Sequence, residues 1–413
     1  MMLPEKTDIL AFAYSDWNAS WSTPQQLMSR LAPQHRVLYV DQPRSMFYNL
    51  RPRDSQGAGI WSGSRLQEVS DNLFVFHPRH SFLPLGFLPP AIALKNYKIN
   101  GFILAYLLQR CIKHLGMKNP LIWNFSVLHG GAIKHLPRCL TLYDLCDEWV
   151  SYIPQSWGRA TASRIEDNLC RQADLVFTGT EFSREKRRHL NPEMHVVPHA
   201  ADYNLFSKAQ LESTEIAEEL KSLPRPVIGS IGVLDPARFD TELMVYLAKA
   251  HPEWSIVLVG PARNEMDCMP LRRIPNIYLL GNRPISELPS YLKGMDVTLI
   301  PYALNEATKG IYPLKLHEYL AAGKIVLAPP LPALLEYEEV VYLAADHVEF
   351  ERKIIQSLEE DSAEAIARRQ AVARENSWEK RLEAKCAHIS RMIRLKEQTV
   401  THGNEESRLN EQS

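Results

Sequence analysis

Residues 313–327 read Pro-Leu-Lys-Leu-His-Glu-Tyr-Leu-Ala-Ala-Gly-Lys-Ile-Val-Leu, and this stretch decides the fold. It predicts a short helix that begins at Pro313, ends at Gly323 and leads into a buried strand, because proline suits a first helical position and glycine suits the position after a helix end. Lys315 and Glu318 are three residues apart and share one face of that helix. Free N–H groups at a helix start attract anions, so the stretch predicts a diphosphate beside Lys315 and a sugar diol beside Glu318. An ordinary amphipathic helix with a solvated Lys/Glu pair is the alternative.

Strand-like and helix-like segments alternate on both sides of this stretch. Apolar runs predict strands at 8–14, 35–40, 72–76, 120–124, 140–143, 175–178 and 195–198. The pattern restarts with strands at 227–231, 255–259, 277–279, 296–300 and 325–328. We therefore predict an α/β protein of two Rossmann-like, doubly wound domains that face each other across a cleft, with ligands beyond the carboxyl ends of the strands.

The order and spacing of several short motifs resemble the GT-B glycosyltransferases of family 4, also called glycosyltransferase group 1. The resemblance covers most of residues 225–380, and within the family it is nearest a subgroup that includes teichuronic-acid biosynthesis glycosyltransferases. Its motifs, besides residues 313–327, are Gly229-Ser-Ile-Gly232, Trp254-Ser-Ile-Val-Leu-Val-Gly260, Asn276-Ile-Tyr-Leu-Leu-Gly281, Asp296-Val-Thr-Leu-Ile-Pro301 and Asn376-Ser-Trp378.

The strand pattern, the polar composition of the last residues and the resemblance together predict a division of the chain and a set of donor-binding residues. The predicted parts are an acceptor-side domain over 1–204, a nucleotide-sugar-binding domain over 205–375, a helix over 376–396 that returns to the first domain, and a disordered tail over 397–413. The predicted donor-binding residues are Gly232, Arg238, Arg283, Tyr312, Lys315 and Glu318, with Lys315 also catalytic because it would stabilise the departing diphosphate.

One position departs from the family pattern. Many family 4 members carry an earlier glutamate that contacts the transferred sugar, and the matching residue here is Gly310. Lys309, Tyr312 or Glu306 could substitute for that contact.

Three carboxylates follow a predicted strand of the first half, at Asp144, Asp147 and Glu148. Acids at a strand end can act as a base for an acceptor hydroxyl, while helix capping is the alternative. The stretch resembles the Tyr-Asp-x-x-Asp-Glu motif of the same subgroup, and we favour Asp147 over Asp144 as the catalytic base. If transfer retains the anomeric configuration, no strong base is needed.

Two further loops supply acceptor-side candidates. The sequence His129-Gly130-Gly131 follows a strand, and paired glycines let backbone N–H groups approach a phosphate, although a simple turn is the more common reading. Asp16 and Trp17 follow the first strand, where related enzymes bring backbone amides to the donor phosphates.

Charge is distributed unevenly along a chain whose net charge is −1. Residues 72–143 contain no Asp or Glu but eight Lys and Arg, interleaved with apolar segments. Such a surface suits anionic lipid headgroups. We therefore predict that residues 80–118 make a peripheral contact with a membrane. A core helix with a solvated basic face is the alternative. Nucleic acid is disfavoured, because no binding motif is present and the pI is near neutral.

Six scattered cysteines, the lack of an apolar leader and the lack of a long apolar run predict a cytoplasmic protein, associated at most with the inner membrane surface. The predicted activity is an EC 2.4 hexosyl transfer from a UDP-sugar to a saccharide or polyprenyl-linked acceptor in cell-surface polysaccharide synthesis. We expect no cofactor and no metal, since no Asp-x-Asp motif accompanies a donor-side strand. A nucleotide-sugar epimerase and a non-catalytic sugar-nucleotide-binding partner are the alternatives. An oxidoreductase is disfavoured, because the third glycine of the dinucleotide fingerprint is missing after Gly232.

Overall fold

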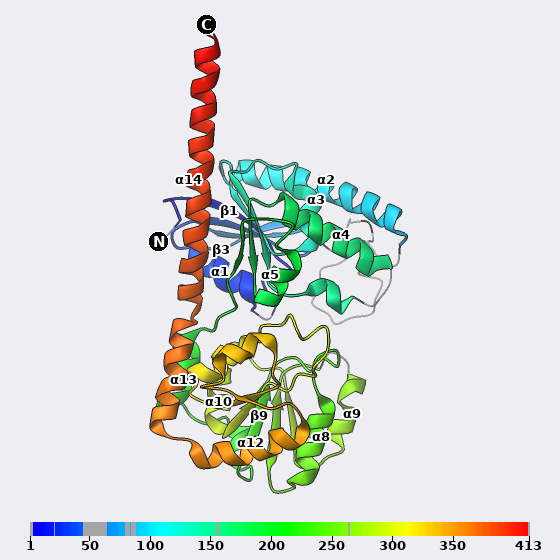
Figure 1. The fold of residues 1–413 in the computed structure, drawn as a ribbon, viewed down its shortest axis with the longest axis vertical. Helices are drawn as coiled ribbons and strands as arrows, with labels where there is room; N and C mark the ends of the chain where they lie inside the picture. The colour runs from blue at the N-terminus through cyan, green and yellow to red at the C-terminus, as the bar shows by residue number, and fades with distance from the viewer. Residues whose placement is uncertain are drawn as a thin grey trace. The chain divides into compact units, whose positions relative to one another are not determined.

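The computed structural model describes residues 3–19, 21–43, 64–78, 83, 88–153, 157–262 and 265–411. The chain forms two compact units, the first made of residues 1–179, 183–197 and 382–413 and the second of residues 180–182 and 198–381. Figure 1 shows a sheet with helices in each unit. The sequence placed the two main boundaries after residues 204 and 375, whereas the chain enters the second unit at Pro198 and leaves it after Arg381.

The first unit contains an eight-stranded sheet in the order β3-β4-β2-β1-β5-β6-β7-β8. All neighbouring pairs are parallel except β3 with β4. The strands are β1 Asp8–Phe12, β2 Arg36–Val40, β3 Arg65–Ser70, β4 Leu73–His77, β5 Leu121–Asn124, β6 Leu140–Leu145, β7 Leu175–Thr178 and β8 Met194–Val196. The sequence prediction missed β3, because this edge strand is mostly exposed and lacks an apolar run.

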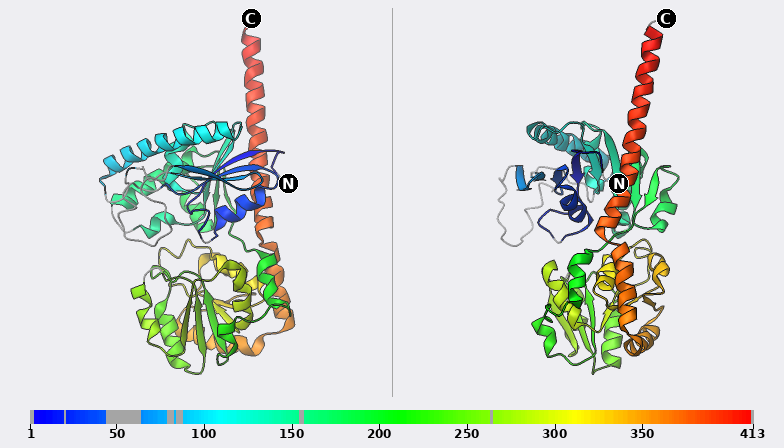
Figure 2. Two further views of the ribbon diagram at one scale, coloured as in Figure 1. Left: turned by 180° about the vertical axis from the view of Figure 1, so that it is seen from behind. Right: turned by 90° about the vertical axis from the view of Figure 1, so that its left-hand side faces the viewer.

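Helices cover both faces of this sheet (Figure 2). They are α1 Thr23–Leu31, α2 Pro90–His114, α3 Gly130–Ile133, α4 Trp157–Gln172, α5 Glu181–Arg187 and the later part of α14 Trp378–Glu411. The buried side of α2 contributes Leu104, Leu108 and Ile112 to a core that also holds Leu10 and Ile122 of the sheet. None of the described helices is both long and apolar enough to span a bilayer.

The C-terminal helix α14 packs on the first unit through charged contacts. Lys385 donates to Asp144 at 2.6 Å, and Lys396 lies 2.7 Å from Asp174. The helix runs on to Glu411 without interruption, whereas the sequence suggested a disordered tail from residue 397. The polar character of a segment therefore does not by itself end a helix.

The second unit contains a six-stranded parallel sheet in the order β11-β10-β9-β12-β13-β14. This is the order 3-2-1-4-5-6 of a Rossmann fold, which confirms the predicted α/β class. Its strands are β9 Val227–Ile231, β10 Ser255–Val259, β11 Ile277–Gly281, β12 Val297–Leu299, β13 Ile325–Ala328 and β14 Tyr342–Leu343.

The helices of the second unit include the one predicted between residues 313 and 323. They are α6 Tyr203–Phe206, α7 Glu218–Lys221, α8 Thr241–Ala250, α9 Met269–Arg272, α10 Leu288–Gly294, α11 Leu314–Ala321, α12 His347–Glu360 and α13 Ala363–Glu375. Gly323 ends α11 in a left-handed conformation, with φ of +68°. Pro313 precedes the first helical residue instead of occupying that position, and its ψ of 115° is extended.

Candidate functional site

The site in the second unit lies where the strand order reverses. β9 and β12 are neighbours in the sheet, and their crossovers leave in opposite directions. Loops that follow two such strands separate and leave a crevice at the carboxyl edge, which is the usual ligand position in this topology. The loop after β9 carries Gly232 and Arg238, and the loop after β12 leads into α11 with Lys315.

Lys315 lies against the backbone of Gly232. A Cβ placed on Gly232 would come within 3.1 Å of Lys315 Nζ and 3.3 Å of its Cε. The φ of Gly232 is +136°, a conformation that residues with a Cβ rarely adopt. The structure thus brings together two residues that lie far apart in the sequence and that were both predicted to bind the donor.

A second glycine supports the same loop. Gly260, which follows β10, has φ of +144°, and a Cβ there would lie 2.1 Å from the carbonyl oxygen of Gly232. A side chain at position 260 would therefore push the Gly232 loop out of place. The backbone N–H of Gly232 donates to Val259 at 2.8 Å, which joins the two loops.

The charges around Lys315 favour an incoming anion. Burial and, to a smaller extent, the charge of Arg238 lower the pKa of Lys315 to about 7, and Glu318 opposes the shift. Burial likewise raises the pKa of Glu318 to about 7 against the pull of Lys315. Among the described residues no carboxylate lies within ion-pair distance of the Lys315 ammonium. A bound diphosphate would supply the missing negative charge.

Tyr302 links the two cations of this site. The Lys315 Nζ lies 5.2 Å from the centre of the Tyr302 ring, and the Arg238 guanidinium lies 6.0 Å from it. The backbone of Ala303 donates to Arg238 at 2.8 Å, so the loops after β9 and β12 are also joined directly. Sequence reasoning did not single out Tyr302, because its role depends on this three-dimensional packing.

Arg283 lies at a different place on the sheet edge. It follows β11, two strands away from β9, which corresponds to about 10 Å at normal strand spacing. Its side chain donates to Tyr291 Oη at 2.6 Å and to Glu219 Oε1 at 2.9 Å. The charge of Arg283 is therefore already paired, unlike that of Lys315.

The structure places Tyr312 in the core of the second unit. Its side chain is 3% exposed, and its hydroxyl lies 2.7 Å from both His317 Nε2 and Tyr337 Oη. The side chain belongs to the core because the chain turns inward just before α11, a detail that local sequence does not reveal. Glu306 and Lys309, the other two suggested substitutes for the missing glutamate, form an ion pair with each other on the surface.

In the first unit, Asp16 and Trp17 form a well-anchored loop after β1. The backbone N–H of Trp17 donates to Asp41 Oδ1 at 2.8 Å, and Asp16 Oδ1 accepts from the backbone of Gln42 at 3.2 Å. The Trp17 ring is 7% exposed and packs edge-on against Tyr39. Trp17 is thus mainly a packing residue, whereas Asp16 is only partly buried.

His129 is a buried, neutral side chain. Burial lowers its pKa to about 4, and its Nε2–H donates to the carbonyl oxygen of Asp41 at 3.0 Å. Of the two glycines that follow it, Gly130 leaves no room for a Cβ beside Leu169 of α4, and Gly131 packs closely on α2. A Cβ on Gly131 would lie 2.8 Å from the carbonyl oxygen of Tyr97, and one on Gly101 would lie 2.3 Å from Gly131. Their small size is explained by these contacts, without a phosphate.

The three carboxylates at the end of β6 have different surroundings: Asp144 lies within the strand, and Asp147 and Glu148 follow it. Asp144 is 2% exposed and accepts from Lys385 Nζ at 2.6 Å and Trp123 Nε1 at 3.0 Å, which makes it structural. Glu148 is equally buried, whereas Asp147 is partly exposed. Of the three, Asp147 is the most exposed residue, although its Oδ1 atom is buried.

Glu148 is held by a buried cationic network that sequence reasoning missed. Arg187 binds both carboxylate oxygens, Lys186 Nζ lies 2.8 Å from Oε2, and Ser183 donates at 2.8 Å. Arg187 also donates to Glu166 at 2.7 Å. Burial alone would raise the pKa of Glu148, but these donors overcome it and lower the pKa to about 2. The network fixes the turn on which Asp147 sits.

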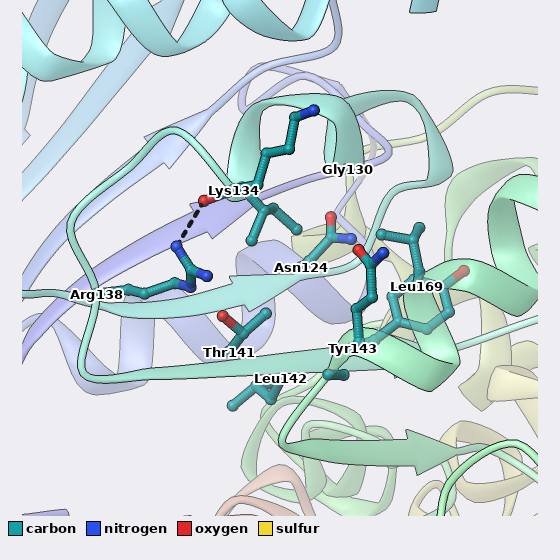
Figure 3. A pocket seen from close by; sticks show the side chains of 11 residues that line it. Asn124, Gly130, Lys134, Arg138, Thr141, Leu142, Tyr143 and Leu169 are labelled. Atoms are coloured by element: carbon teal, nitrogen blue, oxygen red, sulfur yellow. Dashed lines mark hydrogen bonds between the residues drawn. The ribbon is translucent and has the colours of Figure 1, made fainter. Parts of the chain in front are cut away.

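A small cavity of about 50 Å³ lies between the sheet of the first unit and helices α3 and α4 (Figure 3). Asn124 Nδ2 and Thr141 Oγ1, which line it, are buried and have no hydrogen-bond partner among the described residues. Arg138 at its edge donates to two backbone carbonyls. The space suffices for about three waters, and ordered water is the simplest partner for these two groups.

Comparisons with known proteins agree with this geometry. Residues 238–387 match the family described as "Glycosyl transferase-like". A curated relative, the putative teichuronic acid biosynthesis glycosyltransferase TuaH of Bacillus subtilis, is 26% identical over 222 residues, which are 50% of this chain and 55% of TuaH.

Two solved structures resemble the whole chain. The sucrose-phosphate synthase of Thermosynechococcus elongatus superposes with a TM-score of 0.66 at 17% identity, covering 94% of this chain and 99% of the other. Anabaena HepE in complex with UDP and glucose superposes with a TM-score of 0.63 at 18% identity, covering 93% of this chain and 99% of HepE. At these identities the likeness establishes the fold.

Proposed function

We propose that this chain, which has the GT-B fold and a glycosyl transferase-like match over residues 238–387, is a glycosyltransferase that uses a UDP-sugar. The observation that carries the proposal is the buried Lys315 ammonium against Gly232 at the switch point of the second unit. UDP as the nucleotide is supported by HepE, a structural neighbour in complex with UDP and glucose. A saccharide acceptor in cell-surface polysaccharide synthesis is supported by the name of TuaH.

The proposed reaction breaks the bond between the sugar C1 and the diphosphate oxygen and forms a bond from C1 to an acceptor oxygen. Lys315, Arg238 and the start of α11 stabilise the negative charge that develops on the leaving UDP. Glu318 accepts hydrogen bonds from the ribose diol. If transfer inverts the anomeric configuration, Asp147 takes the proton of the acceptor hydroxyl. If transfer retains it, that proton can leave with the diphosphate.

UDP should bind most tightly near pH 7 and more weakly on either side. Above pH 7 the Lys315 amine is increasingly neutral in the free protein, so binding must take up a proton and loses up to about tenfold in affinity per pH unit. Below pH 7 Glu318 becomes protonated and no longer offers a carboxylate to the ribose. Calorimetry in buffers of different ionisation enthalpy measures both the affinity and the proton uptake.

A matched variant separates the two limbs of this profile. Glu318→Gln should flatten the acid limb, apart from the titration of the UDP phosphate itself near pH 6, and keep the alkaline one. A pH-independent affinity between pH 6 and 9 would contradict the assignment of Lys315. Formation of an epimerised nucleotide sugar without acceptor would instead favour the epimerase alternative.

We further propose that the first unit meets an anionic membrane surface through α2, where a polyprenyl-linked acceptor would lie at the cytoplasmic face. The outward side of the helix shows large apolar residues that are between 38% and 62% exposed, namely Ile92, Ile99, Phe102 and Tyr106. The same side carries the exposed cations Lys95, Lys98, Arg110 and Lys113, and the helix contains no acidic residue. Figure 2 shows α2 on the outside of its unit. The rest of the predicted contact, residues 80–82 and 84–87, lies outside the described part of the chain.

The protein should sediment with vesicles that contain anionic lipid and less so at high salt. Each cation near such a surface contributes about 1 kcal/mol, and exposed charges are screened within about 8 Å at physiological salt. Phe102→Ser with Tyr106→Ser should weaken sedimentation. The matched control is Val348→Ser with Ile355→Ser, two exposed apolar residues of α12. Equal and negligible sedimentation with anionic and neutral vesicles would indicate a soluble acceptor.

A further inference from the structure

Tyr319 is buried inside the second unit, yet its hydroxyl makes two bonds to one residue of the site loop. The residue is 0% exposed. Its hydroxyl accepts from the backbone N–H of Ile231 at 2.6 Å and donates to the carbonyl oxygen of Ile231 at 3.2 Å. Ile231 is the last residue of β9 and directly precedes Gly232.

The hydroxyl replaces a backbone partner that the sheet does not provide at this point. The pairing of β9 with β12 ends at Gly229, opposite Thr298. Successive N–H groups of a strand point to opposite sides, and the next one, that of Gly232, donates to β10. The N–H of Ile231 therefore points to the β12 side, where the ladder has ended. A buried backbone N–H needs a partner, and the Tyr319 hydroxyl supplies it.

This bond ties together the two elements that hold the proposed diphosphate. Tyr319 lies one turn after Lys315 on α11, and Ile231 carries the Gly232 loop. Gly232 approaches Lys315 so closely that a Cβ would lie 3.1 Å from Nζ. The distance between the Gly232 backbone and the Lys315 ammonium thus depends on a cross-link from the same helix to the end of β9.

We propose that Tyr319 is a positioning residue for the donor diphosphate: its hydroxyl sets the spacing between Gly232 and Lys315 without contacting the donor. This inference rests on the proposed binding of UDP at that site. Tyr319 should therefore affect binding of the diphosphate and should not affect binding of the nucleoside.

The test compares UDP with uridine as ligands of the full chain and of Tyr319→Phe. Loss of the cross-link should weaken UDP binding about tenfold, an effect expected of one buried hydrogen-bonded contact. The affinity for uridine should stay within about twofold of that of the unaltered chain. The alkaline limb of the UDP affinity profile should also move to higher pH, because Lys315 becomes better hydrated once the loop relaxes.

Tyr337→Phe is the matched control, since it removes another buried tyrosine hydroxyl of the same core, bonded to Tyr312 rather than to the site loop. It should lower the melting temperature without changing the ratio of UDP to uridine affinity. Equal weakening of both ligands by Tyr319→Phe, or no change in a folded variant, would overturn the proposal. Failure of the unaltered chain to bind UDP would instead overturn the proposed function.

If Tyr319→Phe does not fold, amide hydrogen exchange of the unaltered chain provides the second measurement. The Ile231 amide should exchange as slowly as that of Ile228, which lies within the paired part of β9. Fast exchange at Ile231 would show that the hydroxyl does not hold this amide and would equally overturn the proposal.

Discussion

Lys315→Ala should reduce the rate of sugar transfer by about 10²–10³, the usual effect of removing one preorganised charge at a leaving group. The protein should remain folded, because the variant also removes the cost of burying an amine whose pKa is already lowered to about 7. We therefore expect a melting temperature that is unchanged or higher. Initial rates of UDP release with a donor and acceptor in excess measure the first effect, and thermal unfolding measures the second.

Lys309→Ala is the control for this experiment. Lys309 lies in the loop before α11 but is half-exposed and pairs with Glu306, so its loss should change the rate less than about threefold. Near-normal turnover by folded Lys315→Ala would show that the diphosphate is stabilised elsewhere in the chain.

Lys385→Ala should destabilise the protein by about 3–5 kcal/mol, the cost of leaving a buried partner charge unpaired. Lys385 and Asp144 have side chains that are each 3% exposed, and their charged atoms are 2.6 Å apart. Among the described residues, the variant leaves the Asp144 carboxylate in the core with Trp123 and the weak thiol of Cys146 as its donors. Chemical denaturation of the unaltered chain and of Lys385→Ala measures the difference in their free energies of unfolding.

Lys396→Ala tests the same helix at an exposed ion pair. Lys396 and Asp174 are 43% and 25% exposed, and such pairs contribute less than about 1 kcal/mol. Combining Lys385→Met with Asp144→Asn should recover most of the lost stability, because neither partner then carries a buried charge. Equal effects of Lys385→Ala and Lys396→Ala would mean that the buried pair contributes no more than a surface pair.

The parallel sheets were predictable because their strands are apolar on both faces. The runs that form β1 and β10 contain almost no polar residue, so the sequence alone predicts them as buried strands. The edge strand β3 does not, since it is half-exposed and obtains its partner only from β4. The proximity of Gly232 and Lys315 followed from topology, because both come after strands that neighbour each other at the switch point.

The surroundings of single candidate residues depend on partners that are distant in sequence, which a local motif does not show. Asp144 and Asp147 look alike in a local motif, but Asp144 is neutralised by a lysine 241 residues further along the chain. Tyr312 was expected beside the donor, although its hydroxyl is satisfied by His317 and Tyr337 in the core. A linear pattern shows which residues follow a strand, and it does not show which of them turn inward.

The discontinuous first unit has a consequence for the order of biosynthesis. Asp144 emerges from the ribosome 241 residues before Lys385, and at about 5–20 residues per second this is a delay of roughly 10–50 s. During that time the nascent first unit contains a carboxylate without its cation and lacks α14, whose Ile389 side chain is fully buried. The second unit is nearly continuous in sequence and is synthesised within the same interval. We expect the N-terminal half to stay open, and to depend on chaperones, until the last helix of the chain has been made.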